Sequence, residues 1–289
     1  MYKILILGSS GLLGYHIYKK LSTYSKIQLF HTGLKKRYAN LLNKKNIKKL
    51  LITKNPDIII NCIGFTNIEK CEKFKSVSKK INFELLKNIF LIKKKNKLKF
   101  NLIHISTDQL YNKKNNKKNN ENSKIFILNT YCKHKRMAEH ICLKNKALVF
   151  RTNFFGKSFQ KTKSFSDWVF QSFKTKKKTY LFNDVKFNPL RIDTITKLFL
   201  SLIKQKKYKI HGIYNLGTRD GIFKNEFALF FAKKTFVLNS NYAYINVNKL
   251  LKVKRSTNMF MNIKKFENKF KIKLPYIKKE ILEETKKYI

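Results

Sequence analysis

Two residues of one predicted helix could together deliver a proton. The apolar pattern predicts a helix over residues 131–143, and it places Tyr131 and Lys135 one turn apart on the same face. A tyrosine, with an ordinary pKa of about 10, is a poor acid–base catalyst at neutral pH. A nearby ammonium group stabilises the phenolate and lowers that pKa. The same lysine could also hold the ribose of a nicotinamide cofactor.

Lysine is so abundant in this chain that the spacing alone carries little weight. Tyr15 and Lys19 have the same spacing, but in a helix where they would face away from a nicotinamide. The strand predicted over residues 100–106 adds context, because Ser106, Thr107 and Asp108 lie at its carboxyl end. Ligands bind at that edge of an open α/β sheet. Thr107 could hydrogen-bond a substrate carbonyl; the alternative is that these residues only cap the strand and turn.

A glycine-rich turn is the second feature that could bind a ligand. Gly8, Gly11 and Gly14 lie between a strand predicted over residues 2–7 and a helix predicted over 11–21. Glycines allow the backbone to approach a pyrophosphate, and the start of the helix supplies partial positive charge. The G-x-x-G-x-x-G spacing differs from the commoner G-x-G-x-x-G, so a purely structural turn is the alternative.

The residues after the second predicted strand, 26–30, bear on the choice of cofactor. An acidic residue here would bind the ribose hydroxyls of NAD and repel a 2′-phosphate. This chain has none, and Lys35, Lys36 and Arg37 follow instead. The cations favour NADPH, with NADH as the alternative.

The remaining pattern predicts the fold class. Strands over residues 57–63, 100–106 and 147–151 alternate with a helix over 77–94, which is typical of βαβ units and a parallel sheet. We therefore expect an α/β fold with a Rossmann-type doubly wound parallel sheet and a smaller C-terminal α/β substrate-binding region. Residues 1–152 would form the NAD(P)-binding domain. Residues 153–289 would mostly bind substrate, with some segments returning to the first domain. Further elements are expected at 213–216 (strand), 264–270 and 276–288 (helices), and an exposed Lys/Asn-rich loop at 112–122.

Composition restricts the partners. The net charge of +49 alone would suggest nucleic acid, but the cations are nearly all lysine and are spread along the chain. This distribution indicates a solvated surface and a compositional bias, so we expect no nucleic-acid partner. No apolar run is long enough to span a membrane, and no signal peptide is visible, so a cytoplasmic protein is expected. Four separated cysteines favour reduced thiols, and no metal site is expected.

Several stretches, taken in order, resemble an extended short-chain dehydrogenase/reductase, most closely the dTDP-4-dehydrorhamnose reductase branch. The collinearity from residue 4 to about 275 is more specific than any one motif. The matching stretches are residues 8–14, Asn-Pro-Asp-Ile-Ile-Ile-Asn61, His-Ile-Ser-Thr-Asp108, Asn129-Thr-Tyr131 with Lys135 and Glu139, Arg151-Thr152, residues 212–217, Arg255 and Lys273-Leu-Pro275.

The resemblance implies a role for each matched residue. Tyr131 would protonate the C4 oxygen of a nucleotide-activated 4-keto-6-deoxy sugar as hydride arrives, in cell-surface polysaccharide precursor synthesis. Lys135 would lower the tyrosine pKa and bind ribose, and Thr107 would orient the carbonyl. Asn82 would support a water relay to the lysine. The remaining implied residues are Gly8, Ser10, Gly11, Leu12, Gly14 and Thr66 for the cofactor, and Asp108, Gln109, Asn153 and Arg255 for the substrate.

Departures from the branch bear on the reaction. The family usually has Tyr-Val-Phe after Ser-Thr-Asp, whereas this chain has Gln109-Leu-Tyr111; Phe154 replaces a common tryptophan, and Arg255-Ser lacks a proline. Related dehydratases usually carry a glutamate at the position of Gln109. An amide cannot donate a proton as that acid does, so the chain favours carbonyl reduction over dehydration.

Some alternatives remain open at the sequence level. The chain could be a catalytically silent family member acting as a regulatory or binding subunit, although the retained Thr107, Tyr131 and Lys135 weigh against this. A homodimer is compatible with the sequence. His104 is interpreted as a satisfied core histidine and Trp168 as core packing. Glu69, Glu72 and Glu84 are interpreted as surface charges rather than metal ligands.

Overall fold

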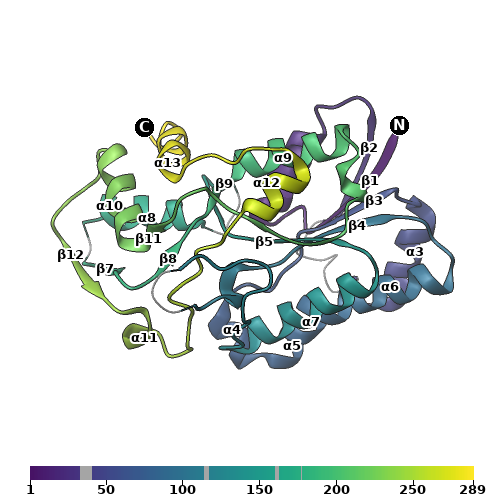
Figure 1. The fold of residues 1–289 in the computed structure, drawn as a ribbon, viewed down its shortest axis with the longest axis horizontal. Coiled ribbons are helices and arrows are strands. Elements are labelled where there is room, and N and C mark those ends of the chain that lie inside the picture. Colours follow the sequence, from purple (N-terminus) through teal and green to yellow (C-terminus); the bar gives the residue numbers. More distant parts are fainter. Residues whose placement is uncertain (33–40, 114–116, 160–162, 177) are drawn as a thin grey trace. The chain divides into compact units, whose positions relative to one another are not determined.

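The computed structural model describes residues 1–32, 41–113, 117–159, 163–176 and 178–289. The backbone packs into two units (Figure 1). The first unit comprises residues 1–106, 129–150 and 195–213. The second comprises residues 107–128, 151–194 and 214–289. Neither unit is a continuous stretch of chain, because the backbone passes from one to the other five times.

A six-stranded sheet organises the first unit. Its strand order is β10-β5-β4-β3-β1-β2, and the pairs β1/β2, β1/β3, β3/β4 and β4/β5 are parallel. The chain order reverses between β1 and β3, which is the switch point of a doubly wound sheet. The predicted Rossmann-type fold is therefore confirmed. The strands are β1 (Tyr2–Leu7), β2 (Ile27–Thr32), β3 (Ile58–Asn61), β4 (Asn101–Ile105), β5 (Leu148–Thr152) and β10 (Gly212–Leu216).

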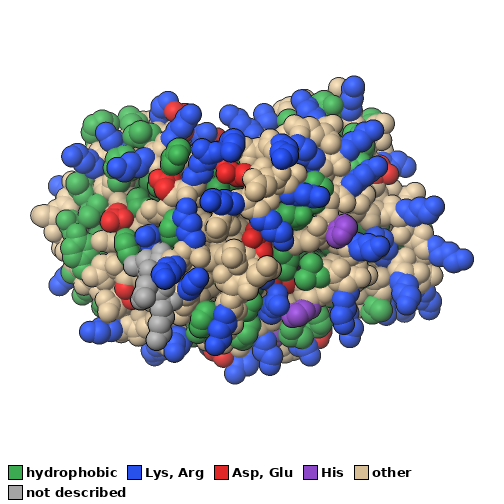
Figure 2. All heavy atoms as spheres, in the orientation of Figure 1, with side chains coloured by type: hydrophobic (Ala, Val, Ile, Leu, Met, Phe, Trp, Pro, Cys, Tyr) green, Lys and Arg blue, Asp and Glu red, His purple; other side chains and the backbone are tan. Residues whose placement is uncertain are grey.

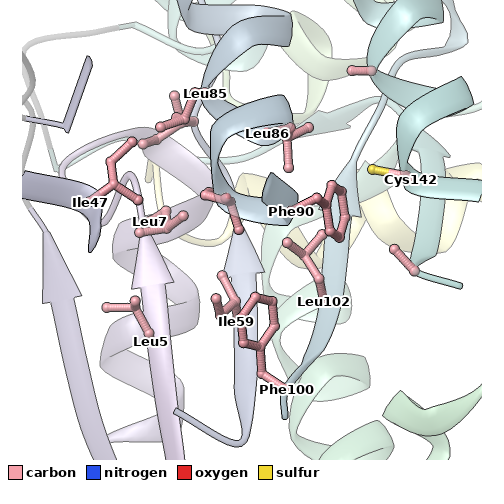
Figure 3. Packing of buried hydrophobic residues seen from close by; sticks show 14 of the residues in the cluster. Leu5, Leu7, Ile47, Ile59, Leu85, Leu86, Phe90, Phe100, Leu102 and Cys142 are labelled. Atoms are coloured by element: carbon pink, nitrogen blue, oxygen red, sulfur yellow. The ribbon is translucent and has the colours of Figure 1, made fainter. Parts of the chain in front are cut away.

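Helices cover both faces of this sheet. Leu5 and Leu7 share a buried cluster with residues of α3, α6 and α7 (Figure 3). Side chains alternate along a strand, so Phe150 points to the other face, where its ring contacts Phe199 of α9. The helices are α1 (Leu12–Leu21), α3 (Lys44–Lys54), α4 (Ile68–Lys73), α5 (Lys75–Lys79), α6 (Leu85–Lys95), α7 (Thr130–Lys144) and α9 (Ile192–Lys204).

A π-helical turn, Lys80–Glu84, joins α5 to α6. The sequence predicted one helix over residues 77–94, and the structure has a helical path there with this wider turn inside it. Such turns interrupt the regular hydrogen-bond ladder without ending the helix, so apolar periodicity does not reveal them. Asn82 lies within the turn.

The second unit has its own core around Phe227, Phe231 and Ile281. Short strand pairs surround it: β7/β12, β8/β11 and β6/β9. Its strands are β6 (Phe154–Phe155), β7 (Thr179–Phe182), β8 (Lys186–Phe187), β9 (Leu190–Arg191), β11 (Ile222–Phe223) and β12 (Tyr242–Ile245). Its helices are α8 (Phe165–Lys174), α10 (Lys224–Lys234), α11 (Val247–Leu250), α12 (Lys264–Phe270) and α13 (Ile277–Thr285), with short 3-10 turns at Asp108–Leu110 and, in the first unit, Lys207–Lys209.

Two expectations were wrong in detail. Trp168 does not pack in a core: it is 39% exposed and stacks on the ring of Phe165 at 5.8 Å. Asn119, in the loop expected to be wholly exposed, is fully buried. The Asn119 side-chain amide donates to the carbonyl of Phe260, and its backbone forms a β-bridge with Met261. A polar residue is buried here because backbone groups take part in its hydrogen bonds.

Lysine and arginine side chains are scattered over the visible face of the molecule rather than gathered in one patch (Figure 2). This distribution matches the spread of lysines along the sequence. Among the described residues, no helix is long and apolar enough to cross a bilayer.

Ile59 gives a direct test of the first core. It is fully buried in β3, between the helices and its neighbouring strands. Replacing it by alanine should lower the free energy of unfolding by about 2–5 kcal/mol, because both burial and packing are lost. Chemical denaturation measures this. The matched change at Ile52, which is 46% exposed on α3, should stay within about 0.5 kcal/mol; equal losses at both positions would contradict the assigned core.

Candidate active site

Two positions of the glycine-rich turn, Gly8 and Gly14, have no room for a side chain. Gly8 has a φ of +88°, and a Cβ there would lie 2.9 Å from the backbone nitrogen of Ile63. A Cβ on Gly14 would lie 2.2 Å from the carbonyl oxygen of Gly8. Helix α1 therefore begins tight against the end of β1, with Gly11 at its N-cap and no side-chain cap. The start of α1 can present backbone N–H groups to an anion.

Two serines in this turn behave differently. The Ser9 hydroxyl donates to the carbonyl of Thr32 at 2.6 Å, which ties the turn to the end of β2. The Ser10 hydroxyl oxygen is shielded from water and has no hydrogen-bond partner among the described residues. A shielded hydroxyl without a partner, beside backbone that admits no side chain, fits the phosphates of a dinucleotide. Leu12 opens the first turn of α1.

The loop after β3 is fastened by Asn82. The Asn82 side chain accepts from the N–H of Phe65 at 2.9 Å, and donates to the Phe65 carbonyl at 3.0 Å and to the Ser78 hydroxyl at 3.2 Å. These bonds fix the loop that carries exposed Thr66. The π-helical turn thus places Asn82 as a support for this loop, at the edge of the sheet where the glycine turn also lies.

Helix α7 is anchored at its start. The Asn129 side chain accepts from the N–H of Cys132, and Glu72 accepts from the N–H of Thr130, both at 2.9 Å. The Thr130 bond holds the pKa of Glu72 below its usual value. Capping of this kind fixes the first turn of a helix. Tyr131, 7% exposed, lies in that turn.

Lys135, one turn later, is buried and 3% exposed. Its Nζ lies 2.5 Å from the carbonyl oxygen of Ile105, to which it donates, and 3.2 Å from Nε2 of His104. Burial lowers the pKa of Lys135 to about 8, and the Glu139 carboxylate acts in the opposite direction. Glu139 itself accepts from Ser106 at 2.7 Å and pairs with Arg136 at 3.0 Å. Lys135 is therefore held at the end of β4.

His104 has a larger place in the site than the sequence suggested. It is 1% exposed and both ring nitrogens have partners, as expected of a core histidine. One partner is Lys135 and the other is Asn61, on the neighbouring strand β3. The pairing of Asn61 with His104 across β3 and β4 aligns the two side chains. Sequence patterns could not reveal these two contacts, because they join side chains of three separate elements, β3, β4 and α7.

In the second unit, the structure brings together Asp108 and Asn153. Thr107 caps a short 3-10 turn by accepting from the N–H of Gln109. Asp108 is buried and accepts from the Asn153 amide at 2.9 Å. Burial raises the pKa of Asp108 to about 6, although the Asn153 bond opposes the shift. The Gln109 amide donates to the sulfur of Met259.

A lysine that sequence reasoning missed, Lys224, belongs with this group. Loss of water around its ammonium lowers its pKa to about 8, Asp108 opposes that shift, and the like charge of Arg255 adds to it. Asp108 and Arg255 are therefore within electrostatic reach of one lysine. Lys224 also lines a pocket of about 160 Å³ together with Phe165, Trp168, Tyr180, Leu181 and Phe182. A pocket with aromatic rings and a lysine suits a ligand that has a planar ring and a negatively charged group close to that ring.

The burial of Lys135 should appear in the pH dependence of stability. Its folded pKa of about 8 lies below the usual 10.5, so between these values the unfolded chain holds a proton that the folded protein lacks. Stability from this residue is full above pH 10.5 and falls as the pH drops to 8. From pH 10.5 to pH 8, the free energy of unfolding of the parent protein should fall by roughly 3 kcal/mol relative to that of Lys135→Met.

Denaturation at several pH values measures this difference. Lys87→Met, at an exposed position on α6, is the control. Its curve of unfolding free energy against pH should run parallel to that of the parent protein. Parallel curves for Lys135→Met as well would contradict a lysine pKa depressed by burial.

Comparison with known proteins places the chain in a family. The RmlD substrate binding domain model matches residues 2–288. The chain is 25% identical over 143 residues to the spore coat polysaccharide biosynthesis protein SpsK of Bacillus subtilis, covering 49% of this chain and 48% of that protein. It is 25% identical over 165 residues to the dTDP-4-dehydrorhamnose reductase of Salmonella typhimurium, covering 55% and 54%. The chain thus aligns with about half the length of each curated relative.

A solved structure supports the same fold. The dTDP-4-dehydrorhamnose reductase of Bacillus anthracis, in complex with NADP, superposes with a TM-score of 0.88 at 17% identity and full coverage of both chains. The family match spans nearly the whole chain and contains both units described above. The chain belongs to the RmlD substrate binding domain family.

Proposed function

We propose that this chain is an NADPH-dependent reductase of a nucleotide-activated 4-keto-6-deoxy sugar, of the dTDP-4-dehydrorhamnose reductase type. The observation that carries the proposal is the first turn of α7, where buried Tyr131 precedes a lysine fastened at the end of β4. The named relatives, a reductase of this substrate and a polysaccharide biosynthesis protein, support the same role. The product would serve cell-surface polysaccharide synthesis, in the cytoplasm where such precursors are made.

The cofactor would lie on the glycine turn. Gly8 and Gly14 let the turn close tightly before α1, Gly11 is the N-cap of that helix, and the Ser10 hydroxyl would donate to the phosphates. When bound, the nicotinamide supplies the hydride for the ketone. We favour NADPH as the cofactor because the reductase of Bacillus anthracis was solved in complex with NADP. Lys35, Lys36 and Arg37, the cations expected at a 2′-phosphate, lie outside the described residues.

The chain's own residues would manage the proton and the carbonyl. Tyr131 would donate its phenolic proton to the C4 oxygen, and Lys135 would stabilise the phenolate that remains. Thr107 would donate a hydrogen bond to the same oxygen and hold the carbonyl in place. Gln109, whose amide is engaged with the sulfur of Met259, has no acidic proton to add. Simple reduction is therefore proposed rather than elimination of water.

The second unit would hold the nucleotide sugar. The pocket of Phe165, Trp168, Tyr180, Leu181, Phe182 and Lys224 offers ring faces for a base and a cation for phosphate. Arg255 would supply a second cation, since it is close enough to Lys224 for its charge to lower the pKa of that lysine. Asp108 and Asn153, hydrogen-bonded to each other, offer both an acceptor and a donor for sugar hydroxyls.

Removal of one hydroxyl tests the proton donor. Tyr131→Phe should lower the rate of NADPH oxidation with dTDP-4-keto-6-deoxyhexose by about 10²–10⁴-fold, since general acid catalysis supplies that much. Cofactor absorbance follows the reaction. Tyr15→Phe is the matched control, because Tyr15 and Lys19 have the same spacing on α1, and it should retain the parent rate. A parent protein without turnover would favour the silent-subunit alternative, and equal rates for Tyr131→Phe would rule out this proton donor.

The chain's one tryptophan gives a direct test of the pocket. Trp168 lines it and is partly exposed, so a bound base should change its fluorescence. Titration with dTDP should give a saturable change in the parent protein. In Lys224→Met the same titration should saturate at a dTDP concentration at least tenfold higher, because a phosphate contact is lost. A dTDP affinity equal to the parent's in that variant would place the nucleotide elsewhere.

A further inference from the structure

The end of helix α10 carries an aromatic residue at a position that glycine or asparagine usually takes. Phe236 has a φ of +57°, in the left-handed region that bulky side chains rarely adopt. Its N–H donates to the carbonyl of Lys233 at 3.3 Å, and the N–H of Val237 donates to the carbonyl of Ala232 at 3.1 Å. These two bonds form a Schellman motif, in which the left-handed residue ends the helix.

Polar residues occupy the comparable positions elsewhere in the chain. Among the described residues, seven that are not glycine have a positive φ, and six of these are lysine or asparagine. Phe236 is the exception. It is 82% exposed, and apart from Met1 no large apolar side chain in the described part of the chain is exposed to that degree. Both its backbone conformation and its exposure to water are unfavourable in the isolated protein.

Contacts on either side of Phe236 keep it at the surface. Val237 packs against the core of the second unit, whereas Phe236 and Leu238 are exposed, Leu238 by 43%. The Asn239 side chain donates to the carbonyl of Phe173 at 2.6 Å, which ties this segment to the end of α8. We call Phe236 and Leu238 the apolar tip. Hydrophobic side chains are visible on the part of the surface formed by α10, β7 and β12 (Figure 2).

Lysines lie on both segments that meet at the apolar tip. Two are in the last turn of α10, one is in the last turn of α8, and two more follow α8. All five are exposed: Lys174, Lys176, Lys178, Lys233 and Lys234. No aspartate or glutamate occurs in residues 168–183 or 227–245. The positive charge beside the tip is therefore not neutralised by acidic residues of the same segments.

We propose that the apolar tip and its flanking lysines dock the protein on the surface of an anionic phospholipid bilayer. The ring of Phe236 enters the upper acyl chains, and the lysines remain level with the phosphates. Peripheral proteins combine apolar burial and charge attraction in this way. Lysine is depleted from the cores of protein–protein interfaces, so this mixture of one aromatic ring and many lysines suits a lipid surface better than a protein groove.

Phe236→Asn removes the ring and keeps the turn. Asparagine tolerates a left-handed φ, so the variant should unfold at a denaturant concentration equal to or above that of the parent. Its partition onto vesicles of equal parts phosphatidylglycerol and phosphatidylcholine, measured by sedimentation, should fall by about tenfold, because the burial of one aromatic side chain is lost. A partition equal to the parent's would overturn the proposal.

The high charge of the whole chain calls for a matched control. Phe74 is also exposed, by 46%, and lies between Lys73 and Lys75. Phe74→Asn should bind the same vesicles as tightly as the parent does. Equal losses in Phe74→Asn and Phe236→Asn would indicate adsorption without a preferred surface, and would overturn the proposal.

Vesicles without charge and solutions of high salt test the lysines. The parent should bind poorly to phosphatidylcholine alone, and its binding to anionic vesicles should weaken as salt screens the charges. Equal binding to both kinds of vesicle would contradict a role for the lysines. None of these measurements needs turnover, so a protein that docks but reduces no sugar nucleotide rejects the proposed function and keeps this inference.

A tryptophan probe identifies what the ring contacts. The chain has one tryptophan, so Phe236→Trp in the Trp168→Phe background carries a single reporter. Lipids with bromine on the upper acyl chains should quench its fluorescence, whereas Phe74→Trp in the same background should stay unquenched. Equal quenching of the two reporters, or a change in the mass of the lipid-free protein on Phe236→Asn, would overturn the proposal; the second result would assign the tip to contacts between copies of the chain.

Discussion

The burial of one amine at the end of β4 is the constraint on which the site depends. A lysine buried in protein must either lose its charge or find compensating partners. Lys135 has a carbonyl, an imidazole and, more distantly, a carboxylate already occupied by Arg136. These partners lie on β4 and α7, and Asn61 of β3 in turn bonds to the imidazole. The three elements must therefore be held in register for the amine to be satisfied.

The supports of α7 can be understood from this requirement. Glu72 and Asn129 fix the first turn of the helix, and Ser106 with Glu139 joins it to the end of β4. Asn82 and Ser78 extend the same polar contacts to His134 and to the loop after β3. The glycine turn lies at the same sheet edge, where Gly8 packs against Ile63. Cofactor contacts and proton chemistry thus share one set of backbone positions.

Local patterns predicted much of the first unit and less of the second. Buried parallel strands are continuous apolar runs, so β1, β3, β4 and β5 could be recognised, and the glycine turn could be placed between the first strand and the first helix. The second unit has strands of only two to four residues, which are too short to show a clear alternation of apolar and polar residues. Asn119 shows the limit, because its burial depends on Phe260, a partner distant in the sequence. The same holds for Lys224, and for the contact between His104 and Lys135.

The five passages of the chain between its units affect how the protein can be made. The last segment of the first unit, residues 195–213, follows two of the three segments of the second unit in the sequence. During synthesis, the sheet therefore lacks the helix that covers Phe150 until about two thirds of the chain has been produced. Until then, Phe150 of β5 lacks the ring that packs against it. Nascent chains of this protein should depend on protection against aggregation at that stage, and no single cut in the gene can yield either unit whole.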